Sequence, residues 1–351
     1  MSQNKIESIL NETRRFEPPE RFVSNSQLTI QSLARLKQKA LDDYEKFWAD
    51  LAHQEIQWFT PFTEILDESQ APNYTWFADG KLNASYNCLD VNVNKNPEKI
   101  AVIFEGENGD VRTLTYADLL IEVCRLSNGL LSLGVKPLDR VIIYMPMVPE
   151  AIIAMQACAR IGAVHSVVFG GFSAKAMRDR IQDAEASLVI TADGGYRGGQ
   201  IIPLKESTDT ALQENCDSVK HVVVLQRTEH KIPMRPDRDI WWHELVDGQN
   251  ETCEATPVSS EHPLFILYTS GSTGKPKGIQ HSTAGYLLGA KLTNKWVFDL
   301  AQDDIFWCTA DVGWITGHSY VAYGPLAAGT TIMIYEGAPT YPDGGRFWEI
   351  C

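Results

Sequence analysis

From about Leu89 onward, short apolar runs alternate with longer segments in which apolar residues recur every three or four positions. The runs at 100–104, 141–144, 188–190 and 222–225 have the length and composition of strands, and the segments between them have the period of helices. Strands this apolar are expected where helices cover both faces of a mainly parallel sheet. The pattern therefore predicts an α/β fold built on mainly parallel sheets.

Capping residues mark where two of these helices begin and end. Thr115 and Asp118 form the spacing of a capping box, and Gly134 follows the last apolar position of that helix. Pro149 suits the first turn of the next helix, and Gly162 suits its end. These positions predict two helices packed against the sheet.

The first part of the chain has a different pattern. Apolar residues recur at helical spacing between 28 and 53, and the tract from Trp58 to Trp76 is rich in tryptophan and proline. We expect one amphipathic helix followed by an extended segment that its aromatic residues anchor to the main body. The predicted domains are an N-terminal segment, 1–88, and a larger domain, 89–351. Within the latter, the polar stretch 226–260 is expected to connect two sub-domains.

Composition excludes several functions. The chain has 31 Lys and Arg against 45 Asp and Glu, a net charge of -14, which disfavours nucleic acid or an anionic membrane as the main partner. It has no apolar run long enough to span a bilayer and no signal-peptide pattern at its start, so we expect a cytoplasmic location. Its seven cysteines are widely spaced without a CxxC pair, which predicts reduced thiols and no metal site.

One loop carries the strongest chemical signal. The apolar run Leu264–Leu267 is followed by YTSGSTGKPKG, from Tyr268 to Gly278. Small residues let backbone N–H groups approach phosphate oxygens, hydroxyls donate further hydrogen bonds, and lysine adds charge. A Walker-type loop is disfavoured, because its glycines would be four residues apart and a Ser or Thr would follow its lysine, where this chain has Pro276. Composition alone leaves a tight surface turn open.

Resemblance narrows the choice. TSGSTGKPKG resembles the signature loop of the adenylate-forming superfamily. Three long stretches resemble the AMP-forming acetyl-CoA synthetase family, namely MPMVPEAIIAMQACARIGAVHSVVFGGFS, FILYTSGSTGKPKGIQHSTAGYL and WCTADVGWITGHSYVAYGPLAAGTT. The likeness runs from about Tyr44 to Cys351. It implies the N-terminal lobe of an adenylate-forming enzyme and two half-reactions, in which acetate and ATP give acetyl-adenylate and pyrophosphate, and CoA then displaces AMP. The implied cofactors are ATP, CoA and Mg²⁺.

The resemblance also implies roles for particular residues. Lys275 would stabilise charge on the leaving pyrophosphate, with no general base needed. The phosphate loop would comprise Thr269, Ser270, Gly271, Ser272, Thr273, Gly274 and Lys275. Ile315 and Thr316 would line the acyl pocket. The residues near CoA would be Arg197, Gly198, Gly199, Gln200, Thr316 and Thr340.

The chain departs from the family pattern at two of these positions. Many relatives have a second arginine at the position of Gln200 and an asparagine at that of Thr340, and loss of one positive charge would weaken CoA phosphate binding. Arg197 remains suited to phosphate because its planar fork can bind two oxygens. Trp314 and His318 are at least as well explained by packing as by function.

The resemblance further implies that the lobe continues past Cys351 and that a small C-terminal domain follows it. We therefore expect this chain alone to be inactive. Two alternatives stay open, a fragment that resembles a propionate-activating relative and a non-catalytic remnant that binds CoA, nucleotide or a partner. The expected partners are small-molecule substrates, and the sequence does not predict an oligomeric state.

Overall fold

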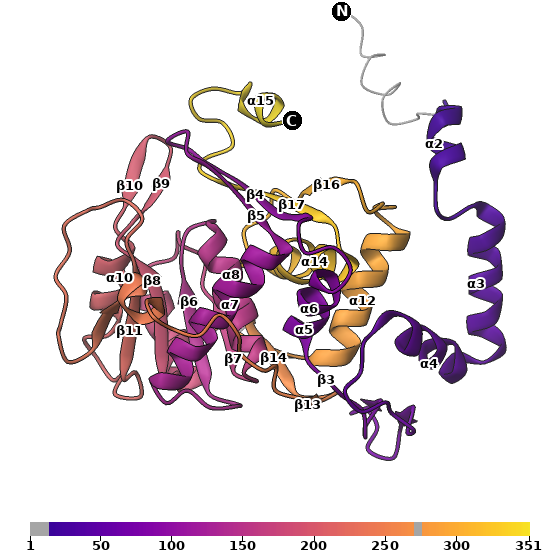
Figure 1. The fold of residues 1–351 in the computed structure, drawn as a ribbon, viewed down its shortest axis with the longest axis horizontal. Helices are drawn as coiled ribbons and strands as arrows, with labels where there is room; N and C mark the ends of the chain where they lie inside the picture. Colours follow the sequence, from indigo (N-terminus) through magenta and orange to yellow (C-terminus); the bar gives the residue numbers. More distant parts are fainter. Residues whose placement is uncertain (1–13, 270–275) are drawn as a thin grey trace, which may run out of the picture.

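The computed structural model describes residues 14–269 and 276–351 (Figure 1). Its largest sheet has seven strands in the order β12-β11-β8-β6-β7-β14-β15. In that spatial order they are Asp239–Trp241, His221–Leu225, Leu188–Ala192, Arg140–Tyr144, Val164–Val167, Pro263–Thr269 and Lys277–Ser282. All neighbours from β12 to β14 pair in parallel, and β15 pairs antiparallel with β14. The predicted α/β fold with a mainly parallel sheet is confirmed.

Helices cover both faces of this sheet. They are α7 (Tyr116–Ser132), α8 (Pro149–Arg160), α9 (Ala174–Ala184) and α10 (Leu204–Ala211). Successive residues of β6 point to opposite faces, so Val141 and Ile143 pack in one core with residues of α7 and α8. Ile142 and Tyr144 pack in a second core with residues of α9 and α10. The near-continuous apolar composition of the strand follows from this double burial.

A second sheet joins early and late parts of the chain. Its order is β16-β17-β4-β5, with bounds Ile305–Trp307, Thr331–Glu336, Ile100–Gly106 and Val111–Thr115. β4 pairs in parallel with β17 and antiparallel with β5. The predicted strand at 100–104 therefore lies between a hairpin partner and a strand more than 200 residues later in the chain.

The predicted helix signals are confirmed at α7 and α8. The Asp118 amide donates to Thr115 Oγ1 at 3.0 Å, and the Thr115 amide donates to Asp118 Oδ2 at 3.0 Å. Gly134 has a φ of 84° just beyond the end of α7. Pro149 begins α8, and Gly162, with a φ of 73°, follows its end.

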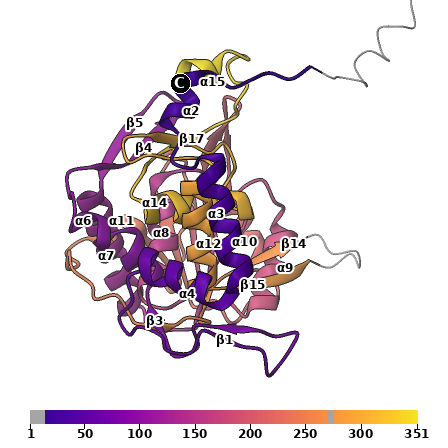
Figure 2. The same ribbon diagram turned by 90° about the vertical axis from the view of Figure 1, so that its right-hand side faces the viewer.

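The single helix predicted between 28 and 53 is wrong. The structure has α2 (Glu20–Asn25), α3 (Ile30–Asp42) and α4 (Tyr44–Glu55), and Figure 2 shows α3 and α4 on the outside of the body. Asp43 leaves the helical conformation, with a φ of -154°, and its side chain accepts a hydrogen bond from the Lys46 amide. An N-cap inside the apolar period therefore starts a second helix.

The predicted anchoring of the following segment is confirmed. Trp58, Phe62 and Phe77 are buried and pack edge-on or tilted against one another. Glu55, at the end of α4, forms ion pairs with Lys291 and Lys295 of α12 (Thr283–Trp296). Short elements complete this region, namely β1 (Leu66–Asp67), β2 (Thr75–Trp76), β3 (Lys81–Leu82), α5 (Ala84–Cys88) and α6 (Asp90–Val93).

The stretch 226–260 does not connect two sub-domains. It contributes β12 to the edge of the large sheet, α11 (Trp242–Val246) and β13 (Val258–Ser259), which pairs with β3. The next strand, β14, pairs with β7 in the same sheet. The expected boundary is wrong because polar composition marked the surface of one sheet instead of a gap between two.

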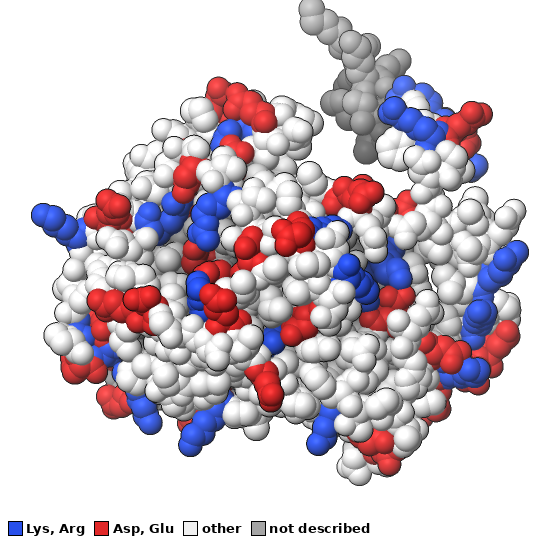
Figure 3. All heavy atoms as spheres, in the orientation of Figure 1, with Lys and Arg blue, Asp and Glu red and all other residues white. Residues whose placement is uncertain are grey.

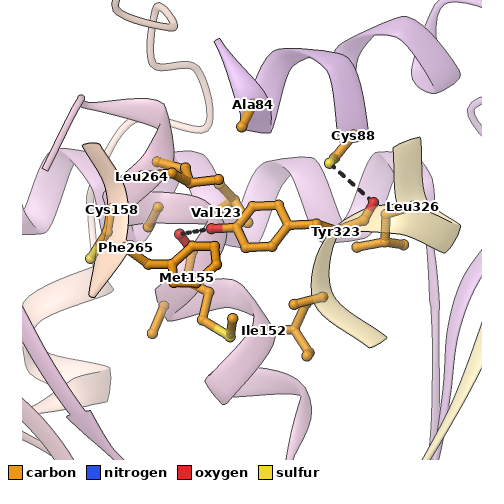
Figure 4. Packing of buried hydrophobic residues seen from close by; sticks show 14 of the residues in the cluster. Ala84, Cys88, Val123, Ile152, Met155, Cys158, Leu264, Phe265, Tyr323 and Leu326 are labelled. Carbon is orange, nitrogen blue, oxygen red and sulfur yellow. Dashed lines mark hydrogen bonds between the residues drawn. The ribbon is translucent and has the colours of Figure 1, made fainter. Parts of the chain in front are cut away.

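The core beside β14 contains a helix with an irregular middle. It comprises α13 (Ile315–Gly317), the π-helix η1 (His318–Tyr323) and α14 (Gly324–Ala328). Tyr323 is fully buried, and its backbone carbonyl accepts from the Cys88 thiol at 3.6 Å (Figure 4). Burial raises the pKa of the Cys88 and Cys158 thiols to about 12, so both behave as small apolar groups. All seven cysteines are free, as predicted.

Candidate functional site

The strand order places a switch point in the large sheet. After β6 the chain forms β7, which lies on one side of β6 in the sheet. The next strand in the chain, β8, lies on the other side of β6. The loops that leave β6 and β7 therefore diverge at the carboxyl edge, which is where ligands bind in open α/β sheets. Two hollows in the structure lie at this edge.

The first hollow, here called the hairpin hollow, holds about 520 Å³ of space that opens to solvent. Its walls come from the segments that follow β6, β7 and β8, and from the ends of later loops. The lining residues are Met145, Pro146, Met147, Phe169, Gly170, Gly171, Gly195, Tyr196, Arg197, Ile202, Leu204, Asp311, Glu336 and Gly337. The hollow is thus built mainly from the ends of the parallel strands.

The second hollow, here called the tryptophan hollow, shares five lining residues with the first, namely Met147, Phe169, Arg197, Asp311 and Gly337. Trp307, Trp314 and Pro339 are among its other walls. The Trp314 ring lies 6.0 Å from that of Phe169, centre to centre. The shared residues form a common border between the two hollows.

A short hairpin carries the predicted CoA-contacting residues. It consists of β9 (Gly195–Arg197) and β10 (Gln200–Ile202), in which Arg197 lies directly opposite Gln200. Gly198 and Gly199 form the turn with φ values of 62° and 72°, a conformation that favours glycine at both positions of a two-residue hairpin. Arg197 is exposed, and its guanidinium carbon lies 5.9 Å from the centre of the Phe169 ring. The hairpin therefore presents the arginine at the border of both hollows.

A buried ion pair fixes the base of this hairpin. Glu336, at the end of β17, accepts from the Tyr196 amide at 3.1 Å and from Arg227 Nε at 2.9 Å. Arg227 also donates to both oxygens of Asp110, at 2.6 and 3.0 Å. Burial raises the pKa of Glu336, and the Arg227 guanidinium opposes that shift. The pairing keeps a charge network beneath the hairpin while leaving Arg197 free of it.

Asp311 gives the border between the hollows a pH-dependent charge. Burial raises the pKa of its carboxyl to about 6, although the Gly313 amide, which donates to Oδ1 at 2.7 Å, and the charge of Arg197 both lower it. The carboxyl therefore gains or loses charge close to neutral pH.

The remaining predicted residues Ile315, Thr316 and Thr340 lie beside the two hollows. Ile315 and Thr316 are exposed at the start of α13, immediately after Trp314. Thr340 is exposed and follows Pro339. None of the three is among the lining residues of the two hollows in the described part of the chain. They lie next to the hollows along the chain, at the side of the tryptophan hollow.

The predicted phosphate loop begins at the same edge of the sheet. Thr269 is the exposed last residue of β14, and it pairs with Lys277, where β15 begins. Since β14 runs parallel to β7, its carboxyl end lies at the edge that holds the hollows. The predicted residues Ser270, Gly271, Ser272, Thr273, Gly274 and Lys275 lie outside the described residues, and their roles stay predictions.

Sequence reasoning missed four acidic and basic side chains of this site, namely Glu107, Arg227, Asp311 and Glu336. Glu336 is the last residue of the apolar strand β17, and Asp311 lies four residues after β16, so both had a usable signal in a parallel sheet. Glu107 directly follows β4, and Arg227 lies two residues after β11, so the same signal was present for both. On the face shown in Figure 3, basic and acidic side chains are interspersed.

Comparison with known proteins identifies the family. A family model described as "AMP-binding enzyme" matches residues 89–351, which includes both hollows and the predicted phosphate loop. The chain therefore belongs to the AMP-binding enzyme family. A second model, described as "Acetyl-coenzyme A synthetase N-terminus", matches residues 33–88.

Curated relatives show which members of this family the chain resembles. Proteins named acetyl-coenzyme A synthetase from Methylobacillus flagellatus, Chromobacterium violaceum and Ralstonia pickettii are 61%, 59% and 59% identical to this chain. The alignments cover 99%, 98% and 98% of the chain and 53% of each relative. The chain thus spans about half the length of the curated relatives it matches. In the described residues no helix is both long and apolar enough to cross a membrane.

Proposed function

We propose that this chain carries the phosphate-loop, acyl-side and CoA-side residues of an AMP-forming acetate–CoA ligase. One observation carries the proposal. Arg197, Trp314, Gly337 and Pro339 line two adjoining hollows at the carboxyl edge of a parallel sheet, beside the end of β14 where the predicted phosphate loop begins. The names of the relatives support acetate and CoA as substrates.

In the first half-reaction, an acetate oxygen attacks the α-phosphorus of ATP and the bond to the β-phosphate oxygen breaks. We assign Lys275 and the hydroxyls of the phosphate loop to the charge that develops on pyrophosphate. A carboxylate is already nucleophilic, so the loop positions the phosphates and stabilises the developing charge, and no general base is needed. Mg²⁺ would arrive on the phosphates of ATP. The described residues hold no group of three His, Cys, Asp or Glu suited to bind it, so we assign it no step.

In the second half-reaction, the CoA thiol attacks the acyl carbon and AMP leaves. Arg197 can hold a CoA phosphate with two parallel hydrogen bonds, and Phe169 supports the guanidinium from below. Gln200, which lies directly opposite Arg197, supplies a neutral donor in place of the second arginine of many relatives. Thr316 and Thr340 would contact CoA from the side of the tryptophan hollow.

The acyl pocket sets the substrate. Ile315 would narrow it by one methylene where the family often has valine, and a methylene is worth about 1 to 3 kcal/mol in discrimination. A smaller pocket favours acetate. A propionate-preferring relative is the second candidate, and the ratio of kcat/KM values for the two acids in a complete enzyme decides between them.

We also propose that this protein is cytoplasmic, acts on small molecules and binds neither nucleic acid nor membrane. The net charge of -14 supports this, because polyanions and anionic lipid surfaces attract basic proteins.

Acetate-dependent exchange of pyrophosphate into ATP tests the function. Because the relatives continue for almost as many residues again, we expect the chain alone to show no more exchange than its Lys275→Ala variant. Addition of the remaining part of the Methylobacillus flagellatus relative should restore exchange to the wild-type chain but not to K275A. Tight association without turnover would favour a non-catalytic protein instead.

A further inference from the structure

The carboxylate of Glu107 is held by three backbone amides from two distant segments. Glu107 follows β4, and its Oε1 accepts from the Gly199 amide at 2.7 Å. Its Oε2 accepts from the Gly198 amide at 2.8 Å and from the Ala338 amide at 2.7 Å. In Figure 1 the turn after β4, the tip of the β9–β10 hairpin and the segment after β17 lie side by side at one corner of the molecule.

These three donors come from the segments that carry the CoA-side residues. Gly198 and Gly199 separate Arg197 from Gln200 in the hairpin, and Ala338 lies two residues before Thr340. An amide hydrogen bond to a carboxylate is stronger than one between neutral groups. Removal of the carboxylate would leave three amide donors without their acceptor.

Gly199 and Gly337, in the two segments around this carboxylate, leave no room for a side chain. A Cβ atom on Gly337 would lie 2.8 Å from Glu107 Oε2, and a Cβ atom on Gly199 would lie 2.7 Å from the Tyr341 hydroxyl. Both contacts are shorter than carbon and oxygen atoms tolerate without movement. The hairpin turn and the segment after β17 therefore fit together closely around Glu107.

We propose that Glu107 is a positioning residue that locks the β9–β10 hairpin against the segment 337–340, so that Arg197, Gln200 and Thr340 face the same CoA molecule. This inference rests on the proposed function, since it names the residue that aligns the CoA-side groups. Glu107 acts through backbone amides and does not itself contact the ligand.

The charge of Glu107 and its anchoring role predict opposite effects of Glu107→Gln on CoA binding. Glu107 is an anion close to Arg197, so its neutralisation by Glu107→Gln strengthens the attraction of any phosphate to the hairpin. Loss of the anchor acts in the opposite direction, because the amide group of glutamine offers one acceptor oxygen and places its N–H₂ donor against a backbone donor. Weaker CoA binding by E107Q therefore cannot be explained by a loss of electrostatic attraction.

The first measurement is amide hydrogen exchange of the 351-residue chain without ligand. We expect E107Q to exchange at least tenfold faster in peptides that cover 195–202 and 337–341, with the rate in β6 unchanged. The matched control is Glu64→Gln, an exposed glutamate of the N-terminal segment. Unchanged exchange at both peptides in E107Q would overturn the proposal.

The second measurement is the dissociation constant for CoA of the same chain by titration calorimetry. We expect E107Q to bind at least fivefold more weakly than wild type, and Glu107→Asp, which keeps the charge but is one methylene shorter, to bind more weakly too. Equal or tighter binding by E107Q, with Arg197→Ala clearly weaker, would overturn the positioning role alone. Absence of CoA binding by the wild-type chain, or no effect of R197A, would overturn the CoA-side assignment and this inference with it.

Discussion

Acid should destabilise this protein through a buried histidine beside the functional edge. His318 has no exposed surface, and its ring lies 4.5 Å from that of Phe265 and 5.4 Å from that of His165. Its Nδ1 lies 3.2 Å from the Trp314 carbonyl, which can only accept, so this nitrogen carries the proton. Nε2 has no hydrogen-bond partner among the described residues. Burial is the main cause that lowers the pKa of His318 from 6.5 to about 3; the hydrogen bond to the Trp314 carbonyl opposes this shift, and the neighbouring His281 adds to it.

The direction and size of the effect follow from this shift. Between the two pKa values the unfolded chain binds a proton that the native state does not, so stability falls as the pH falls below about 6.5. Each pH unit in that window costs about 1.4 kcal/mol. Acidification from pH 7 to pH 5 should therefore lower the free energy of unfolding by about 2 kcal/mol through His318 alone.

Substitution of His318 by asparagine isolates this contribution. Asparagine keeps a donor near the Trp314 carbonyl but does not titrate, so H318N should lose stability by a cavity effect that is independent of pH. Urea unfolding of wild type and H318N, followed by tryptophan fluorescence from pH 7 to pH 5, should show the two free energies converging by about 2 kcal/mol. His243→Asn makes the same change at an exposed position and serves as control. A constant difference between wild type and H318N would refute the reasoning.

Two further experiments test the packing of the body and of the hairpin turn. Asn83→Ala should lower the free energy of unfolding by about 2 to 3 kcal/mol, because the buried Asn83 side chain caps α5 and donates to three carbonyls. Urea unfolding measures this change, and an unchanged urea midpoint would contradict it. Gly199→Ala should weaken CoA binding more than Gly198→Ala does, since both turn positions have positive φ but only the Cβ atom at 199 would meet Tyr341, and equal dissociation constants would speak against this contact.

The sequence predicted the local parts of the fold because their causes are local. Thr115 and Asp118 are three residues apart, so their reciprocal hydrogen bonds could be read from spacing. The apolar strands had to be buried on both faces, which requires helices on both sides. The break at Asp43 was missed because the apolar period continues across it, although an aspartate before a new run of helix-forming residues is itself a capping signal.

The site was predicted less completely because it depends on contacts between distant residues. Glu107 meets Gly198, 91 residues later, and Ala338, 231 residues later. No periodicity or spacing encodes such pairs. Similarly, the placement of β14 beside β7 rather than in a separate sheet follows from the crossover order of the strands, which apolar composition does not specify.

On the proposed function, the same strand order separates the CoA-side hairpin from the predicted phosphate loop. The hairpin with Arg197 follows β8, and the phosphate loop follows β14, with β6 and β7 between them. Three strand spacings correspond to about 14 Å, so the ends of β8 and β14 lie well apart at this edge of the sheet. On this assignment CoA extends from Arg197 across the ends of β6 and β7, where Met147, Phe169 and Asp311 border both hollows. A substitution that loosens the hairpin therefore acts on the CoA half-reaction and leaves the adenylate half-reaction to the phosphate loop.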